Sequence, residues 1–322
     1  MFEPLIQFFL SDWFSAFFNP QRRIFWGYLC SALIISLFWF IAYKKKPLKI
    51  AFHEIFSANS WLSKSARADY LLMIVNSAFI SFFSLRLQGI STIFIALSLA
   101  WLHNLFDGNL AIVKEVSAGV IAIYYTLTLF VLDDFVRYWL HRWLHTIPLL
   151  WSFHKVHHSA TSLNPFTVFR VHPVEVILMI LGRAFVAGVC VIIFVFFFSD
   201  KVTLVTILGA SIFTFLFDVI GSNLRHSNVP LSYYHPVERI FISPAQHQIH
   251  HSSAPEHLNK NYGIVFSLWD LWFDSHCFSL KDQALFYGLQ KAESKPHSFT
   301  SLYLRPFLEA RKIITSFFIA KN

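Results

Sequence analysis

The chain has 322 residues, of which 56% are hydrophobic and 18% aromatic, whereas only 14% are charged. This composition lies outside the usage of soluble domains and predicts a membrane protein, because the apolar residues are concentrated in runs of membrane-spanning length. The formal net charge of +8 fits basic loops facing anionic lipid better than a nucleic-acid surface, so no nucleic-acid partner is expected. The three cysteines lack CxxC spacing, which argues against a disulfide framework, a zinc ribbon or a thiolate-held cluster.

The N-terminal third contains two apolar zones after an aromatic start. Residues 1–23 are broken by two acidic residues and a proline and lack the basic start of a signal peptide, so we expect an interfacial segment and not a cleaved leader. The first predicted span covers 25–43 and is closed by three lysines. A second apolar zone covers 70–106 and is interrupted by Arg86 and Gln88, so it could hold one span or a hairpin.

Three further apolar zones follow. One runs over 116–132, and two more cover 176–198 and 202–221, which we expect to form a tight hairpin across the bilayer. Such a hairpin returns the chain to the side that it left, so the histidine motifs on either side of it share one face of the membrane. Basic residues flank both ends of the first span, so charge alone does not orient the chain.

A polar stripe leaves the bilayer in VLDDFVRYWLHRWLH (131–145). Asp134, Tyr138, His141 and His145 fall within about 40° of one another at 100° per residue, on one face of a helix. An acidic residue inside the membrane is costly and needs a partner. The helix is expected to end near residue 146, since Pro148 biases the residue before it away from helical geometry.

The spacing HxxHH occurs twice, in FHKVHHS and in QHQIHHS. The three histidines of each box lie on one helical face, and they are His154, His157 and His158 in the first box and His247, His250 and His251 in the second. Pro148 can open the first box helix. In the second box helix, Ser243 suits the N-cap and Pro244 suits the first helical position.

A lone histidine is usually an ordinary core or surface residue, but here eight imidazoles form three clusters beside membrane exits. Without metal they would make a strained patch of shifted pKa, so the clusters predict a polynuclear metal site. Imidazole ligation without thiolate suits Zn, Fe, Cu and Ni alike. Eight ligands exceed the four of a structural zinc site and fit two ions with room for a further ligand. Two metals beside a hydrophobic cavity indicate oxygen activation on a lipid, which is chemistry that iron performs.

Through these motifs, the chain resembles the fatty acid hydroxylase/sterol desaturase superfamily of membrane di-iron oxidases. The resemblance covers roughly 130–275 and is carried by DDFVRYWLHRWLH, FHKVHHS, SPAQHQIHHS and NYGIVFSLWDLWF. Membrane fatty acyl desaturases share the box spacing, and the residues flanking the boxes narrow the match to this superfamily. Asp274 and Ser275 stand where relatives tend to have Gly-Thr.

The resemblance implies two iron ions above a four-helix membrane base, with O2 and supplied electrons. Its metal ligands would be His141, His145, His154, His157, His158, His247, His250 and His251, with His226 of NLRHSN as a ninth. His172 would be a ligand or a residue just outside the ligands. Asp134 and Asp270 would orient imidazole N–H groups. We expect His235, His257 and His276 to lie outside the site.

We therefore predict an all-α, polytopic membrane helical bundle with a cytoplasm-facing, histidine-rich helical cap. The predicted regions are an N-terminal membrane and interfacial part (1–115), a di-iron hydroxylase/desaturase-like domain (116–290) and a C-terminal tail (291–322). The cytoplasmic orientation rests on chemistry, because reducing equivalents are made on that side.

The predicted function is hydroxylation or desaturation of a lipid C–H bond, on a sterol, fatty-acyl or ether-lipid substrate. GxGxxG and CxxCH motifs do not occur, so electrons would come from a donor such as ferredoxin or cytochrome b5. Basic residues near Lys155, Arg170, Arg225 and Arg239 offer a dock for an acidic donor. The alternative is a membrane metal transporter or metal-binding protein, which needs polar residues within several spans; 176–198 holds only Arg183 as a charge.

Overall fold

A computed structural model of the protein describes residues 14–108, 113, 115–198, 201–280, 283–290 and 297–319. Most of the predicted interfacial segment, residues 1–13, lies outside this part of the chain, as do the side chains of Arg86 and Gln88. Within the described residues, three helices are long and apolar enough to cross a membrane, and they are Trp26–Tyr43, Ala118–Thr146 and Pro173–Phe198. The protein is an all-α membrane bundle, apart from one short hairpin.

The first of these helices matches the first predicted span. It consists of α2 (Trp26–Phe38) and a π-helical turn, η1 (Trp39–Tyr43), and it stops at the lysine run. Two short helices follow, α3 (Leu48–Ile55) and α4 (Ala58–Leu62). The apolar face of α3 packs with α2 and with the turn that carries His226, so the N-terminal region supports the site directly.

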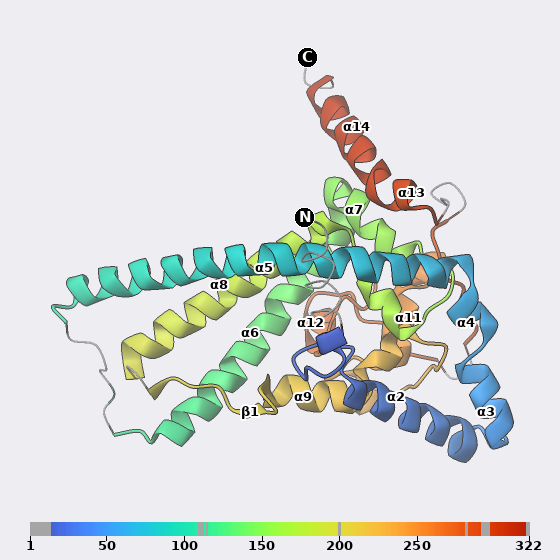
Figure 1. The fold of residues 1–322 in the computed structure, drawn as a ribbon, viewed down its shortest axis with the longest axis horizontal. Helices are drawn as coiled ribbons and strands as arrows, with labels where there is room; N and C mark the ends of the chain where they lie inside the picture. Colours follow the sequence, from blue (N-terminus) through green and yellow to red (C-terminus); the bar gives the residue numbers. More distant parts are fainter. Residues whose placement is uncertain are drawn as a thin grey trace.

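The second apolar zone forms one continuous helix, α5 (Lys64–Leu105), of 42 residues. At 1.5 Å per residue it is about 63 Å long, which excludes the hairpin alternative. The hydroxyl of Ser63 caps its first turn by accepting the Ala66 N–H at 3.1 Å. Figure 1 shows α5 running alongside α8, and the two helices pack together.

The helices α6 (Ala118–Thr146) and α8 (Pro173–Phe198) form the rest of the bundle. They approach closely at Gly182, where an added Cβ would lie 2.5 Å from a methyl group of Leu140. Helix α6 ends at Thr146 as predicted, since Ile147 before Pro148 is extended. The polar stripe therefore leaves the bundle on the last turns of a spanning helix.

The predicted transmembrane hairpin of 176–198 and 202–221 is wrong in its second half. Residues 202–221 form a two-stranded antiparallel ribbon, β1 (Thr206–Ile207) with β2 (Ala210–Ser211), followed by the eight-residue helix α9 (Ile212–Val219). Leu208 and Gly209 both have positive φ, as a two-residue hairpin turn requires. Helix α9 is about 12 Å long, less than half of a bilayer core.

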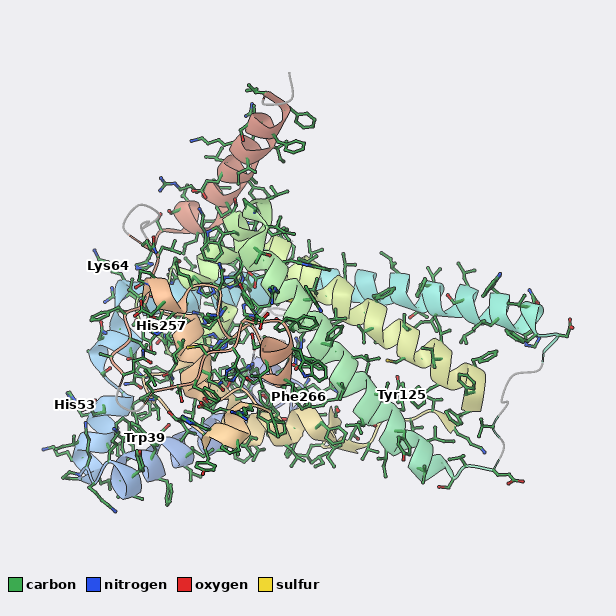
Figure 2. All side chains as sticks on the ribbon, turned by 180° about the vertical axis from the view of Figure 1, so that it is seen from behind. Trp39, His53, Lys64, Tyr125, His257 and Phe266 are labelled. Atoms are coloured by element: carbon green, nitrogen blue, oxygen red, sulfur yellow. The ribbon has the colours of Figure 1, made fainter. Side chains whose placement is uncertain are left out.

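The remaining short elements form a cap on one end of the bundle, which we define as residues 147–172 and 221–280. Its elements are α7 (Pro148–His158), η2 (Pro165–Phe169), η4 (Ser222–His226), α10 (His235–Glu238), α11 (Pro244–His250), η5 (Pro255–His257) and α12 (Leu268–Trp272). Two C-terminal helices, α13 (Phe299–Tyr303) and α14 (Arg305–Ile319), pack against α7 and extend from the cap in Figure 1. Figure 2 shows side-chain nitrogen gathered inside the cap, whereas carbon dominates along the helices that leave it.

Candidate metal centre

The nine predicted ligands lie together inside the cap. They come from four elements, with His141 and His145 on α6, His154, His157 and His158 on α7, His226 on η4, and His247, His250 and His251 on α11 and its C-cap. Local sequence fixes these elements: Pro148 opens α7, and Ser243 with Gln246 forms a reciprocal capping box at the start of α11.

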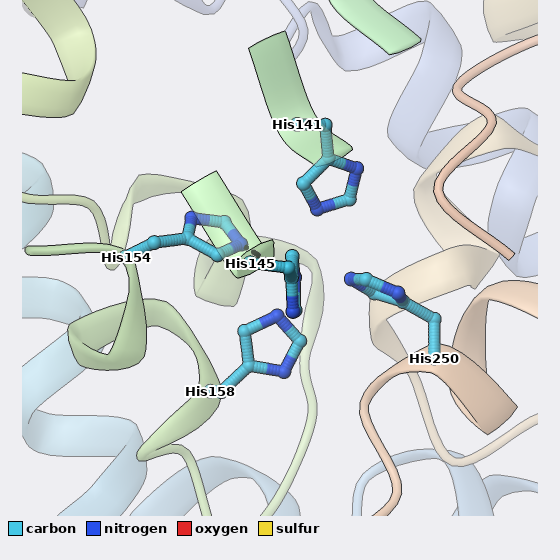
Figure 3. Close-up of side chains that lie close together, drawn as sticks. All are labelled: His141, His145, His154, His158 and His250. Atoms are coloured by element: carbon cyan, nitrogen blue, oxygen red, sulfur yellow. Dashed lines mark hydrogen bonds between the residues drawn. The ribbon is translucent and has the colours of Figure 1, made fainter. Parts of the chain in front are cut away.

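The histidines form two groups. The five-histidine group consists of His141, His145, His154, His158 and His250, and the four-histidine group consists of His157, His226, His247 and His251. Within each group the ligand nitrogens lie within 4.8 Å of one another. Figure 3 shows the rings of the five-histidine group turned toward a common centre.

Each HxxHH box contributes to both groups, which explains the spacing. His154 and His158 stand at i and i+4, about 40° apart on the helix, and enter the same group. His157, about 100° from His158, points into the other group. The second box divides in the same way, with His247 and His251 in one group and His250 in the other.

The donor geometry of the four-histidine group fits a metal ion. The Nε2 atom of His226 lies 3.2 Å from that of His157, 3.0 Å from that of His251 and 3.2 Å from that of His247. One nitrogen carries at most one proton, so hydrogen bonds cannot satisfy three such contacts. A metal–nitrogen distance of about 2.1 Å places neighbouring ligand atoms about 3.0 Å apart at right angles. The spacing of these atoms therefore suits a shared cation.

Burial keeps the imidazoles in the neutral form that binds metal. It lowers the pKa of His154 to about 3 and that of His157 to about 4, the latter with help from nearby histidines. Burial likewise lowers the pKa of His226, His247 and His251 well below the usual value. Their lone pairs are thus available at neutral pH.

Main-chain carbonyls fix the orientation of three rings. The Nδ1–H groups of His141 and His250 donate to the carbonyls of Tyr262 and Lys260, each at 2.8 Å. His157 donates from Nδ1 to the carbonyl of Arg170 at 3.3 Å. A carbonyl only accepts, so Nδ1 carries the proton and Nε2 is the free ligand atom in each ring.

The carbonyls of Lys260 and Tyr262 belong to a loop with unusual backbone geometry. Asn259 and Asn261, on either side of Lys260, have φ of 60° and 55°. Asparagine tolerates this left-handed region better than most residues. The Asn261 side chain is also anchored, because its Nδ2 donates to the carbonyls of Gln246 and Cys277 and its Oδ1 accepts the Cys277 N–H. The loop is thereby tied to the helix that carries the second box.

Asp134 and Asp270 hold the same loop, and neither contacts an imidazole N–H as we had expected. The carboxylate of Asp134 accepts the N–H groups of Val265 and Phe266 and the Trp269 indole N–H, each at 3.0 Å. Arg137 also donates to this carboxylate at 3.2 Å, so backbone and side-chain donors together satisfy the costly acid on α6. The aspartate acts on His141 only through the position of the loop.

Asp270 secures the other end of this loop. Its carboxylate accepts the N–H groups of Tyr262 and Gly263 at 2.8 Å, and burial raises its pKa to about 6. Gly263 has no room for a side chain, because an added Cβ would lie 2.8 Å from Asp270 Oδ2. The Asp274-Ser275 departure fits this arrangement: Asp274 has φ of 58°, a conformation that glycine adopts freely, and the Ser275 hydroxyl donates to Asp270 at 2.6 Å.

His172 belongs to neither histidine group. Its Nδ1 accepts the Val174 N–H at 3.2 Å, at the start of α8, and its Nε2 donates to the carbonyl of Tyr303 at 3.1 Å. It therefore joins α8 to the C-terminal helices. His235, His257 and His276 also lie outside both groups, as expected.

Sequence reasoning missed Glu175, whose carboxylate lies 3.0 Å from the Nδ1 of His154. Both side chains are buried. A carboxylate beside a ligating imidazole fixes its tautomer and raises its basicity. The available signal was an acidic residue in the first turn of an otherwise apolar spanning helix, which needs a partner.

The expected basic dock does not form as proposed. Arg170 and Arg225 are 0% and 2% exposed, and Lys155 is 9% exposed and pairs with Glu309. Of the four predicted residues, Arg239 alone is exposed. Arg170 instead pairs with buried Asp69 at 2.9 Å and holds the carbonyl and hydroxyl groups at the end of α7. Its charge therefore stabilises the helix of the first box and is unavailable to a partner.

Residues 126–275 match the fatty acid hydroxylase family. An alkylglycerol monooxygenase of Caenorhabditis elegans is 29% identical over 175 residues, which is 54% of this chain and 30% of that protein. A Delta(7)-sterol 5(6)-desaturase of Gibberella zeae is 26% identical over 278 residues, covering 83% of this chain and 67% of the desaturase.

An ornithine lipid hydroxylase of Rhizobium tropici is 30% identical over 147 residues, which is 44% of this chain and 38% of the hydroxylase. The chain thus spans less than a third of the length of the alkylglycerol monooxygenases of Caenorhabditis elegans and Danio rerio, at 30% and 31%. No solved structure matches the chain.

Proposed function

Since the chain belongs to the fatty acid hydroxylase/sterol desaturase superfamily, we propose that it is a membrane-bound di-iron oxygenase that hydroxylates or desaturates a lipid. The observation that carries the proposal is the pair of buried histidine groups, which offers nine neutral nitrogen ligands at the end of a membrane bundle. The relatives named for alkylglycerol, sterol and ornithine lipid chemistry support a lipid substrate.

The five-histidine and four-histidine groups would each hold one iron ion. When bound, the two ions supply activation of O2 and cleavage of an unactivated C–H bond. In hydroxylation, one oxygen atom enters the C–H bond and the other leaves as water, with two electrons and two protons consumed. Desaturation removes two hydrogens from the lipid, takes up the same electrons and protons, and releases two waters.

The protein contributes position and exclusion of water. The carbonyls of Lys260 and Tyr262 keep the Nε2 atoms of His250 and His141 deprotonated and aimed inward. The carboxyl group of Glu175 lies beside the Nδ1 of His154 and limits how that ring can turn. Eight of the nine rings are buried and His145 is half-buried, so the cap largely shields these rings from water.

The electrons come from a separate donor, for which ferredoxin or cytochrome b5 are suitable classes. We place the cap on the cytoplasmic side, because ferrous iron must be regenerated where reducing equivalents are made. The donor meets a surface other than the one formed by Arg170, Arg225 and Lys155, which the cap encloses.

The test is metal analysis joined to O2 uptake. Protein purified from iron-replete cells should contain close to two irons per chain, and adding reductant and a lipid extract should start O2 consumption and give an oxidised lipid. Protein stripped by a chelator is the control and should give neither. A single metal per chain, zinc alone, or metal flux into proteoliposomes without lipid oxidation would contradict the proposal and favour a metal-binding or transport protein.

A further inference from the structure

The carbonyl of Arg170 lies in a tight turn beside the four-histidine group. Arg170 has φ of −75° and ψ of 63°, and the Val171 N–H donates to the Phe169 carbonyl at 2.8 Å. These values define an inverse γ-turn. The carbonyl of the central residue, Arg170, accepts the Nδ1–H of His157 at 3.3 Å. The position of one main-chain oxygen atom therefore sets the orientation of a predicted ligand.

A single side chain on α5, Asn76, bonds to the turn on both sides of Arg170. Its Nδ2 donates to the Phe169 carbonyl at 2.9 Å and to the Val171 carbonyl at 2.8 Å. Its Oδ1 accepts the hydroxyl of Tyr303. An amide group has two N–H donors, so Asn76 uses both of them on this turn. Asn76 is 0% exposed, and water therefore does not compete for these hydrogen bonds.

Asp69, two turns earlier on α5, holds the side chain of Arg170. Its carboxylate accepts Nη1 of Arg170 at 2.9 Å, and both residues are 0% exposed. The same carboxylate accepts the Thr167 hydroxyl at 2.7 Å and the Asn164 amide at 3.1 Å. Asp69 and Asn76 lie about 20° apart around the helix axis, because seven residues at 100° each make almost two full turns. One face of α5 therefore fixes both the main chain and the side chain of Arg170.

The rest of the Arg170 guanidinium is also bonded. Nη2 donates to Nδ1 of His297 at 2.6 Å and to the Ser159 hydroxyl at 2.9 Å. Nη1 donates to the Ser65 carbonyl at 3.1 Å, and Nε donates to the Val156 carbonyl at 3.0 Å. All five N–H donors of the planar group thus have acceptors. A rigid fork that is bonded at every donor has one orientation, so Arg170 cannot shift without breaking these bonds.

We propose that Asn76 and Asp69 are positioning residues for the metal centre, which fix the ring of His157 through the turn at Arg170. Both lie on α5, which packs against η2 of the cap (Figure 1) and lies outside the family match at 126–275. This inference rests on the proposed function, because it requires a metal ion in the four-histidine group. The predicted di-iron domain, residues 116–290, then needs the N-terminal region to bind its second ion at full affinity.

The alternative is that α5 stabilises the fold and has no effect on the metal. A satisfied buried amide and a complete buried ion pair both matter to folding, since removal of one partner leaves a buried polar group unpaired. In that case substitution on α5 lowers stability whether or not His157 is present. In the positioning role, the effect on metal affinity depends on the His157 ring.

The test is Co²⁺ binding by the full-length protein after its metal has been removed with a chelator. Absorption titration against a competing chelator gives the affinity of each ion, and the wild type should bind two. Asn76→Leu keeps the size of the side chain, and it should weaken one ion about tenfold, the lower end of the range for residues behind a metal ligand. The other ion should be held nearly as in the wild type.

Thr126→Val is the matched control. Thr126 is 1% exposed, and its hydroxyl donates to the Ala122 carbonyl on α6. The substitution removes a buried hydrogen bond, as Asn76→Leu does. Thr126 lies 15 residues before His141, which is about 22 Å along the helix. Both Co²⁺ affinities should therefore equal those of the wild type.

The decisive comparison repeats Asn76→Leu in a His157→Ala background. Three histidines remain in the group, so weakened Co²⁺ binding can still be titrated. The ring that the turn orients is gone, and Asn76→Leu should therefore weaken binding no further. The double variant Asp69→Leu with Arg170→Met should give the same pattern. It removes both partners of the buried pair, which proteins tolerate better than loss of one partner, so it provides a second variant if Asn76→Leu does not fold.

Two results would overturn the inference. One is wild-type Co²⁺ affinity in these variants, and the other is an equal loss of affinity with and without the His157 ring. Either result leaves the proposed function standing, because the assay contains neither lipid nor O2. If the wild-type protein binds no Co²⁺, the metal centre itself is absent, and the proposed function fails together with the inference.

Discussion

Substitution of Glu175 tests whether a carboxyl group beside a predicted ligand, His154, contributes to metal binding. Its carboxylate lies 3.0 Å from His154 Nδ1, and the two side chains are 7% and 2% exposed. In Glu175→Ala the buried Nδ1 of His154 loses the polar oxygen that lies 3.0 Å from it, which costs about 1–3 kcal/mol. If this cost falls on the metal-bound state, metal affinity falls about 5- to 150-fold. Glu175→Gln keeps a polar oxygen in the same place but lacks the carboxyl group, and we expect a loss of about 1 kcal/mol, or about fivefold.

The assay is chelator competition on the purified protein, with retained iron measured by elemental analysis. The expected order of retention is wild type, then Glu175→Gln, then Glu175→Ala. Glu54→Ala is the matched control, because that glutamate forms a partly exposed pair with Lys46 away from the histidines. If Glu175→Ala retains iron as well as Glu54→Ala does, the carboxylate contributes nothing to metal binding and the reasoning is refuted.

Three further predictions concern the ligands, the orientation and the charge state. His157→Ala should lose iron and turnover, whereas His276→Ala should keep both; equal loss would remove the distinction between ligand and neighbour. In a background lacking the three native cysteines, Glu256→Cys should be labelled by a membrane-impermeant thiol reagent only after cells are permeabilised, and labelling of intact cells would place the cap outside. The metal-free protein should lose stability as the pH falls below 6.5, because unfolded histidines bind protons there while burial holds the pKa of His154 at about 3. The slope should be about 1.4 kcal/mol per pH unit for each such histidine, and a denaturation midpoint that stays constant from pH 8 to pH 5 would contradict it.

Helical periodicity, together with the prolines and capping residues at helix starts, predicts the parts of the fold that depend on neighbouring residues. Pro148 and Ser243 mark the starts of α7 and α11 because a proline or a capping hydroxyl acts within one turn. The grouping of His154 with His158 follows from helical geometry alone. The hydropathy of residues 202–221 wrongly predicts a membrane-spanning helix, because hydropathy measures apolar content and ignores the turn at Leu208 and Gly209.

The parts that sequence does not predict depend on residues distant along the chain. Arg137, one helical turn away, is a partner of Asp134 that the sequence can suggest. Its other partners include main-chain N–H groups more than 130 positions away, and backbone donors leave no residue-type signal. Arg170 reads as a surface cation until Asp69, 101 positions earlier, is seen to enclose its charge. Chain topology determines these contacts, and local composition does not.

The two histidine groups differ in the oxygen atoms that lie next to the Nδ1 atoms of their rings. Behind the five-histidine group lie the Lys260 and Tyr262 carbonyls and the Glu175 carboxylate. Among the described hydrogen bonds, the four-histidine group has a single main-chain acceptor of this kind, the Arg170 carbonyl at 3.3 Å. The five-histidine group therefore has more of its rings positioned by neighbouring oxygen atoms than the four-histidine group has. This asymmetry originates in one loop and one glutamate and not in the histidine boxes.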